Sequence, residues 1–159
     1  MSVFFGQHTK ALDDKHRIII PSEYRKAVKE KGAGKPGEFF LTITPGKGRC
    51  LSLFTVEQFN KLFMQFDPDS SFNNEDMQDY ARFIAGYSHL GVCDKQGRYA
   101  IPTNLREDVG IQKEVVLVGV ITHVEIWDSG MWKQYNIEKR ASISEVTRRI
   151  RREQSGDEN

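Results

Sequence analysis

Two short stretches of the sequence combine an aspartate, turn-forming residues and an arginine, a set that can shape a turn and bind an anion. The first runs from Asp13 to Arg17 and the second from Asp94 to Arg98. An aspartate side chain accepts nearby backbone N–H groups, and a guanidinium can bind phosphate or bridge O6 and N7 of guanine. The sequence contains no GxSxG motif, Gly-rich phosphate loop or recognisable Cys/His pair. We therefore expect a binding protein and not an enzyme.

Both stretches belong to an internal repeat. Residues 13–25 align with residues 94–106 at a constant offset of 81, and an Asp, Arg, Ile, Pro and second Arg are identical in the two copies. Further along, residues 39–43 correspond to 115–119 and residues 51–54 to 124–127. The first copy has extra residues within 29–37 and 45–49, whose Gly, Lys and Pro content predicts loops.

The repeat predicts a mainly β fold with helices, of the α+β class. In each copy a turn leads to a strand at 17–20 or 98–101. Pro21 or Pro102 ends that strand and opens one or two helical turns. Further strand pairs are predicted at 39–44 with 51–54, and at 115–120 with 124–127. One copy of about 45 residues is too small for a comfortable core, so we expect the two copies to pair and share one.

Helices are predicted between and after the copies. Phe59, Leu62, Phe63 and Phe66 follow helical spacing, and we interpret their aromatic stripe as core and not as a platform for stacking bases. After a break at residues 67–71, a second helix carries Met77, Tyr80, Ala81 and Ile84. Two C-terminal helices are expected, one at 131–137 and one opened by Ser142 and Glu145 as a capping box. The predicted division is 7–54 and 88–131 for the copies, 55–87 for a helical linker and 132–159 for a helical tail.

Composition favours a cytoplasmic globular protein, with 38% hydrophobic and 28% charged residues. No stretch approaches the roughly 18 apolar residues of a membrane span, and the first ten residues do not resemble a signal peptide. Cys50 and Cys93 form no CxxC motif, and the four histidines have no metal spacing, so we expect small strand hydrophobes and no metal. The net charge of +1 hides a basic surplus in residues 1–54 and 132–159, and it is local potential that attracts a polyanion.

The motifs Asp-x-Lys-His-Arg-x-x-x-Pro and Asp-x-x-Gly-Arg-x-x-x-Pro resemble the paired signatures of the MraZ family. Phe4-Phe5-Gly6, residues 116–119 and Glu125-Ile126-Trp127 agree with it, so the resemblance covers about residues 3–135. It implies two AbrB-like swapped-hairpin modules that form a pseudo-dimeric barrel. One departure is clear, because His16 stands where the family has glycine. A histidine tolerates positive φ less well than glycine, which makes a more strained turn an expectation.

The resemblance also implies a function. Members are cytoplasmic, nucleoid-associated transcriptional regulators, usually repressors, that assemble into ring-shaped homo-oligomers. They bind double-stranded DNA at direct repeats upstream of the division and cell-wall gene cluster that contains their own gene. No cofactor, small-molecule ligand or membrane partner is expected.

Candidate DNA-binding residues come mainly from the first copy. Arg17 is the first choice for reading bases, with Arg98 at the matching place, but each arginine could instead pair with the aspartate of its own turn. His16 adds a donor, and the expected phosphate contacts, which ordinary solvated charge would also explain, are Lys10, Lys15, Arg25 and Lys26. Arg25 and its equivalent Arg106 could alternatively pin a helix to the partner copy. The run Arg148–Arg152 is better explained by cations near a helix C-terminus than by DNA.

The charge split predicts that the first copy faces DNA and that the second serves mainly in pairing and assembly. Two other functions stay open at this point. One is an antitoxin-like protein of the AbrB group that neutralises a partner, although such proteins usually have one β module and a long flexible tail. The other is an enzyme, for which the sequence offers no site.

Overall fold

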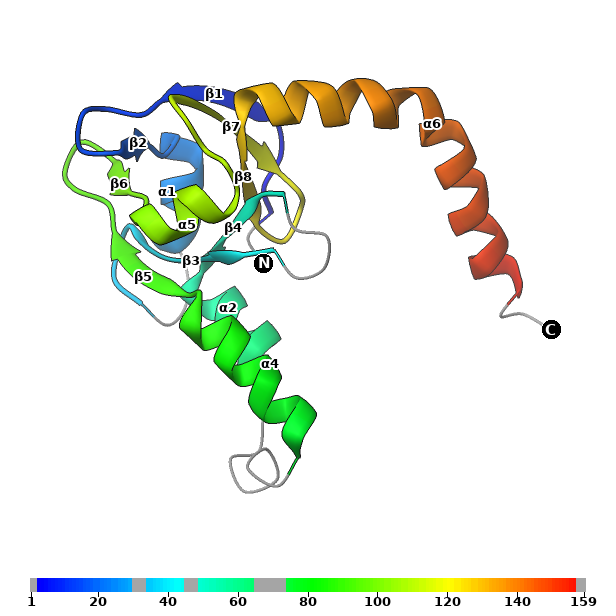
Figure 1. Cartoon of the computed structure of the whole chain (residues 1–159), viewed down its shortest axis with the longest axis horizontal. Helices are drawn as coiled ribbons and strands as arrows, with labels where there is room; N and C mark the ends of the chain where they lie inside the picture. The colour runs from blue at the N-terminus through cyan, green and yellow to red at the C-terminus, as the bar shows by residue number, and fades with distance from the viewer. Residues whose placement is uncertain (1–2, 30–33, 45–48, 65–73, 157–159) are drawn as a thin grey trace. The chain divides into compact units, whose positions relative to one another are not determined.

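The computed structural model describes residues 3–29, 34–44, 49–64 and 74–156 of the chain, and it has the predicted α+β class (Figure 1). Residues Met1–Ser129 form one compact unit and Gly130–Asn159 a second. The strands are β1 (Gln7–Ala11), β2 (Arg17–Ile19), β3 (Glu38–Ile43), β4 (Leu51–Thr55), β5 (His89–Val92), β6 (Arg98–Ala100), β7 (Glu114–Gly119) and β8 (Val124–Asp128). The helices are α1 (Ser22–Lys29), α2 (Val56–Phe63), α4 (Glu75–Gly86), α5 (Thr103–Asp108) and α6 (Ser129–Gly156).

The two copies of the repeat exchange strands. The six-stranded sheet has the order β1-β7-β8-β4-β3-β5, and β2 pairs with β6 in a separate two-stranded ribbon. The first strand of each copy therefore lies against the third strand of the other, as β1 does with β7 and β5 with β3. This is the exchange that the family resemblance implies. The barrel is not confirmed, because β1 and β5 each pair on one side only and leave the described sheet open.

A local twofold relation connects the copies. In the ribbon, Ile18 lies opposite Tyr99, which is its own equivalent at the 81-residue offset. In the sheet, Ser52 lies opposite Glu125, again its own equivalent. Two antiparallel pairs that each match a residue with its equivalent place the same pseudo-twofold axis through both layers. The duplicated sequence thus folds as an internal pseudo-dimer.

One core serves both copies, as predicted. The large cluster of buried residues draws on β2, β3 and α1 from the first copy and on β6, α5 and β7 from the second. Tyr99 is fully buried, and its hydroxyl donates to the Phe39 carbonyl at 3.0 Å. Its ring lies against Gly91, where a Cβ atom would approach the ring to 2.7 Å. A packed interior cannot absorb such an overlap, so glycine is required at that point of β5.

The linker helices α2 and α4 confirm the predicted pair, with one correction. Phe59 is 5% exposed and stacks on Phe40 with 3.9 Å between ring centroids, so this part of the aromatic stripe is core. Leu62, however, is 48% exposed and points away from the packed face. The covered face of α2 is the one that packs on the sheet and on Ile84 of α4, and Leu62 lies outside that face. Phe66, the break at 67–71 and loop residues 30–33 and 45–48 lie outside the described residues.

The C-terminal unit corrects the prediction of two helices, because α6 is continuous from Ser129 to Gly156. No glycine or proline interrupts residues 131–155, and the Ser142 hydroxyl donates to the Lys139 carbonyl at 3.2 Å and caps no helix. The run Arg148–Arg152 ends before the last turn, which contains no basic residue. The helix dipole acts mainly within that last turn, so the explanation from the helix C-terminus is wrong. None of the described helices has the length and apolar character needed to cross a membrane.

Substitutions in β2 test the role of the ribbon. Ile18 is 1% exposed and lies on the pseudo-twofold axis, whereas its neighbour Ile19 is 48% exposed. We expect Ile18→Ala to lower the free energy of unfolding by about 2–5 kcal/mol, since it leaves a cavity in the shared core. The matched control Ile19→Ala should cost less than about 1 kcal/mol. Urea unfolding followed by circular dichroism measures both, and equal losses would contradict a core centred on this ribbon.

Candidate nucleic-acid interface

The carboxylate of Asp13 closes the first turn. Its Oδ1 accepts the backbone N–H groups of Lys15 and Arg17, both at 2.9 Å, and its Oδ2 accepts Nε of Arg17 at 2.8 Å. The His16 N–H donates to the Asp13 carbonyl at 3.0 Å. Arg17 therefore pairs through Nε with the aspartate of its own turn, which is the structural alternative that the sequence left open. The same bond fixes the direction of the guanidinium, whose two Nη atoms form its outer edge.

The second turn is built in the same way. Asp94 Oδ1 accepts the N–H groups of Gln96 and Arg98 at 2.9 Å, and Oδ2 accepts Nε of Arg98 at 2.7 Å. The Gly97 N–H donates to the Asp94 carbonyl at 2.9 Å. The aspartate and the arginine, which the two turns share, therefore make the same bonds in both copies.

The ribbon holds the two turns close together, and both lie at the same end of the compact unit (Figure 1). The Ile20 N–H donates to the Gly97 carbonyl at 2.9 Å, and the Ile101 N–H donates to the His16 carbonyl at 3.1 Å. Nη1 of Arg17 lies 3.9 Å from Oδ2 of Asp94 in the other copy. The pairing of β2 with β6 therefore makes one surface of two distant sequence segments.

His16 and Gly97 occupy equivalent left-handed positions, with φ of 57° and 84°. The hydrogen bonds of the two turns match, so the histidine does not change the shape of its turn. Gly97 has a second role, because a Cβ atom there would lie 2.7 Å from Cζ of Arg25. Nε of Arg25 also donates to the Ile20 carbonyl at 3.0 Å. Arg25 thus packs on the turn of the partner copy, in line with the alternative that it pins its helix to that copy.

Side chains alternate between the two faces of a strand, and this defines the outer face of the ribbon. Ile18 and Tyr99 point inward, so Arg17 and Ile19 from β2 share the outer face with Arg98 and Ala100 from β6. The side chains of Arg17 and Arg98 are 24% and 35% exposed. Sequence reasoning missed Ile19 and Ala100 as surface residues, although the alternation with buried Ile18 and Ile20 would have placed Ile19 outward.

The other candidate residues are distributed unevenly around this face. Lys15 and His16 are exposed at the tip of the first turn, and Lys26 is exposed on α1. Lys10 is half-buried on edge strand β1, and within the described residues no hydrogen bond or ion pair joins it to either turn. The structure therefore gathers every predicted contact except Lys10 around the ribbon and its turns.

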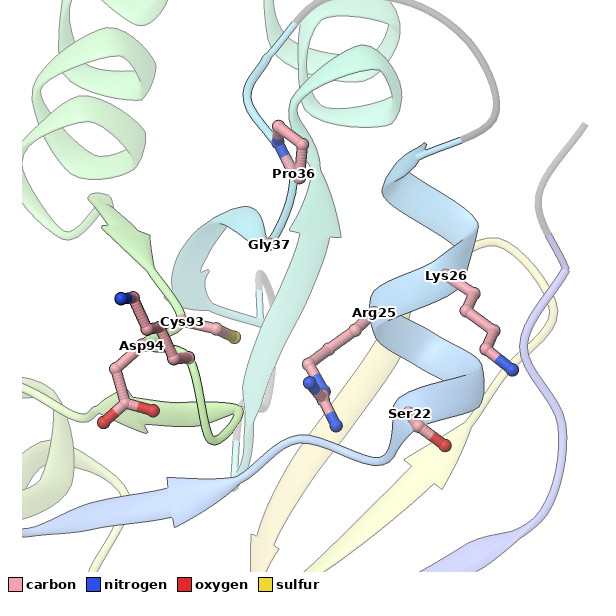
Figure 2. Close-up of a pocket in the computed structure, with 8 residues that line it drawn as sticks. Ser22, Arg25, Lys26, Pro36, Gly37, Cys93 and Asp94 are labelled. Atoms are coloured by element: carbon pink, nitrogen blue, oxygen red, sulfur yellow. The ribbon is translucent and has the colours of Figure 1, made fainter.

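A cleft opens beside the second turn, with a volume of about 330 Å³. Figure 2 shows α1 on one side, contributing Ser22, Arg25 and Lys26, and the segment with Cys93 and Asp94 on the other. Pro36, Gly37 and Lys95 complete its lining. Sequence reasoning missed Lys95, because it belongs to the copy whose overall charge is negative. Burial raises the pKa of the Cys93 thiol to about 11, so this side chain is a neutral wall of the cleft.

Hydrogen bonds lower the pKa of the carboxyl group in both turns. The Arg17 N–H is the main reason why the pKa of Asp13 lies below its ordinary value. In the second turn the Arg98 N–H and guanidinium lower the pKa of Asp94 to about 2. Both carboxylates are therefore ionised near neutral pH, and each holds its arginine through a charge-assisted bond. Among the described residues, no group of His, Cys, Asp and Glu is arranged to hold a metal ion.

Comparisons with known proteins agree with this architecture. The family model described as "MraZ protein, putative antitoxin-like" matches twice, over residues 3–82 and 89–153. The chain belongs to the MraZ family. A protein of Acetivibrio thermocellus named "Transcriptional regulator MraZ" is 33% identical over 149 residues, covering 93% of this chain and 96% of the relative. Proteins with that name from Kocuria rhizophila and Cutibacterium acnes are 35% and 32% identical, covering 93% and 96% of this chain and 96% and 100% of the relatives. The double match confirms the tandem repeat that the MraZ signatures indicate.

Acid titration tests the bonds that close the second turn. The pKa of Asp94 in the folded chain is about 2 against an ordinary value of 3.8. Its contribution to stability is therefore present above pH 3.8 and is lost as the pH falls through about 2. We expect the amide resonances of Gln96 and Arg98 in NMR spectra to titrate with a midpoint near 2. A midpoint near 3.8 would mean that the carboxylate is not held as described.

Substitutions at the two left-handed positions test the turn geometry. We expect Gly97→Ala to lower the free energy of unfolding by about 1–2 kcal/mol from backbone strain alone, with a further loss from displacing Arg25. His16→Gly should cost nothing or stabilise slightly, because glycine adopts this conformation freely. Thermal unfolding of the two variants measures the difference. A harmless Gly97→Ala would contradict the close approach of Arg25.

Proposed function

We propose that this MraZ-family protein is a sequence-specific DNA-binding transcriptional regulator that reads DNA with the outer face of the β2–β6 ribbon. The observation that carries the proposal is the presence of Arg17 and Arg98 on one ribbon face, each held by its own aspartate. The names of the relatives support transcriptional regulation. A two-stranded ribbon fits the major groove, which is about 12 Å wide.

The chemistry of this face suits base reading. Because Nε of each arginine is occupied by its aspartate, the Nη atoms are left as the donors for guanine O6 and N7. A guanidinium fixed in advance loses less conformational entropy on binding than a free one. Ala100 lies opposite Arg17 and Ile19 lies opposite Arg98 on this face, and both can contact thymine methyl groups. Lys15, His16, Arg25 and Lys26 then serve as phosphate or edge contacts around the reading face.

The finer proposal follows from the family and from the shape of the unit. We propose a cytoplasmic, nucleoid-associated repressor that forms a homo-oligomer, most simply a ring, on direct repeats upstream of the division and cell-wall gene cluster containing its own gene. Each ribbon is three residues per strand, so one subunit touches few base pairs. Several linked subunits on repeated sites raise the effective concentration of every further contact. We propose that the protein regulates transcription by binding DNA and not as an enzyme.

The charge balance suggests that the two copies contribute unequally, with the first facing DNA and the second serving mainly in pairing and assembly. Arg17 and Arg98 have equivalent places on the ribbon, so any inequality must come from their neighbours. Lys15 and His16 flank the first arginine, whereas Gln96 and Gly97 flank the second. We therefore expect Arg17 to matter more than Arg98.

An antitoxin-like role is the second candidate, favoured by the description of the family model and by an α6 that buries none of its residues. Recovery of a stoichiometric small protein partner that loses affinity when Ile143 and Ile150 are changed to Ser would support it. The two tandem modules instead of one favour the DNA-binding candidate. A turnover that disappears in Asp13→Asn or Asp94→Asn would support the third candidate, an enzyme.

Binding to the DNA upstream of its own gene tests the proposal. Fluorescence anisotropy would compare that duplex with a shuffled one of equal composition at two salt concentrations. We expect specific binding that weakens with salt and a loss of about 5- to 150-fold for Arg17→Ala. Arg98→Ala should lose less, and equal losses would overturn the predicted inequality. Equal affinity for both duplexes would overturn sequence-specific binding.

Arg17 also shapes its turn, so a control must separate the two roles. Asp13→Asn keeps the cation and disturbs the same turn. Its circular dichroism and melting temperature show how much folding each variant loses. If Asp13→Asn weakens DNA binding as much as Arg17→Ala, then the arginine acts only through the turn. A much smaller loss in Asp13→Asn assigns the contact to the guanidinium.

A further inference from the structure

The cleft beside the second turn is built jointly by the two copies. Helix α1 of the first copy supplies Arg25 and Lys26, and the turn of the second copy supplies Asp94 and Lys95. Figure 2 shows the Arg25 side chain extending from α1 into the space between these elements. Since Arg25 also packs on Gly97, the cleft is continuous with the flank of the reading face.

The charges in this cleft are mainly positive and unpaired. Its lining contains three cations and one anion. The anion, Asp94, already accepts two backbone N–H groups and Nε of Arg98. Within the described part of the chain, Lys26 and Lys95 form no ion pair, and the one hydrogen bond of the Arg25 side chain is from Nε to Ile20. Three cationic residues therefore line a cavity that can hold an anion. Figure 2 shows the Arg25 side chain extending into it and the Lys26 side chain extending to the other side of α1.

Two of the three equivalent positions in the other half carry the opposite charge. At the 81-residue offset Lys26 corresponds to Glu107 and Lys95 to Asp14. Arg25 corresponds to Arg106, whose Nη2 donates a hydrogen bond to the Thr103 hydroxyl at 2.9 Å. The one added cation is Lys113, at the place of Gly37. The fold is pseudo-symmetric here, but the charge is not.

We propose that the cleft of Arg25, Lys26 and Lys95 seats a backbone phosphate of the bound duplex, and that the pseudo-equivalent positions do not. The proposal rests on the proposed DNA-binding function and adds to it. A duplex read by the ribbon passes its phosphates along the flanks of the two turns, and only one flank attracts them. Each subunit therefore lies on DNA in one direction, which two-sided contacts would not impose. A free phosphate-bearing small molecule would satisfy the same chemistry, so the test separates the two sources.

The test measures the salt dependence of DNA binding by the full chain. Arg25 is left intact because it also fixes the end of β2. We expect Lys26→Gln with Lys95→Gln to weaken binding to specific and shuffled duplexes alike, by about 5- to 20-fold at low salt, since phosphate contacts carry no sequence information. The slope of log K against log salt should fall by about 1, the value for one lost phosphate contact. Both side chains are exposed, so the melting temperature should not change.

Lys113→Gln is the matched control, because it removes one exposed cation from the other half. We expect less than a 2-fold change and an unaltered slope, and Glu107→Gln should behave likewise. Slopes that fall equally in Lys113→Gln and in the double variant of the cleft would overturn the one-sided seat. The ratio of the affinities for the specific and the shuffled duplex tests the proposed function separately. If the two affinities are equal, the proposed function fails, but the salt slope can still be measured on either duplex.

A titration with inorganic phosphate is the second part of the test. Titration followed by the NMR signals of Lys26 and Lys95 should show only weak binding, in the millimolar range, that is lost in the double variant. Micromolar phosphate binding together with an unchanged DNA salt slope would assign the cleft to a free anion and overturn the DNA seat. No shift at any concentration, together with an unchanged slope, would overturn an anion site altogether.

Discussion

The antiparallel pairing of β2 with β6 is the constraint on which the rest of the structure depends. These strands are three residues long, and Ile18 and Tyr99 are buried at their centre, on the pseudo-twofold axis. Such short strands are stabilised mainly by side-chain burial and not by their few hydrogen bonds. The buried face of the ribbon therefore fixes the positions of two turns that lie 81 residues apart in sequence.

The aspartate in each turn links this pairing to binding. A carboxylate that accepts two N–H groups and an Nε–H does two things at once, because it stabilises a turn and directs a guanidinium. If the proposed function holds, Arg17 has both a structural and a DNA-contacting role, since the two roles would use different nitrogen atoms. The arginine costs the fold little, as its charge is balanced by Asp13, yet its Nη edge stays at the surface. Binding affinity gained this way does not require a loop to become ordered.

Much of this architecture could be predicted from the sequence, because it follows from local patterns and from the repeat. The turns, the prolines after β2 and β6 and the shared core follow from residues 13–25 and 94–106. The continuous α6 could not be deduced from a possible cap at Ser142, since a serine can bond either to a helix start or back to a preceding carbonyl. The cleft was also out of reach, because Lys26 and Lys95 line the same cleft only after the two copies exchange strands.

Duplication within one chain explains how binding can be directional on a pseudo-symmetric frame. In a dimer of identical chains, every substitution appears on both sides of the axis, so a cation at position 26 would face an identical cation across it. Here Lys26 and Glu107 can differ while Ile18 and Tyr99 still pair, because interior positions must fit each other and exposed positions need not. The fold thus keeps its symmetry where packing demands it and loses it where charge meets solvent. A polyanion lying across the ribbon would meet a surplus of positive charge on one flank and none on the other, which orients it without any difference in the backbone.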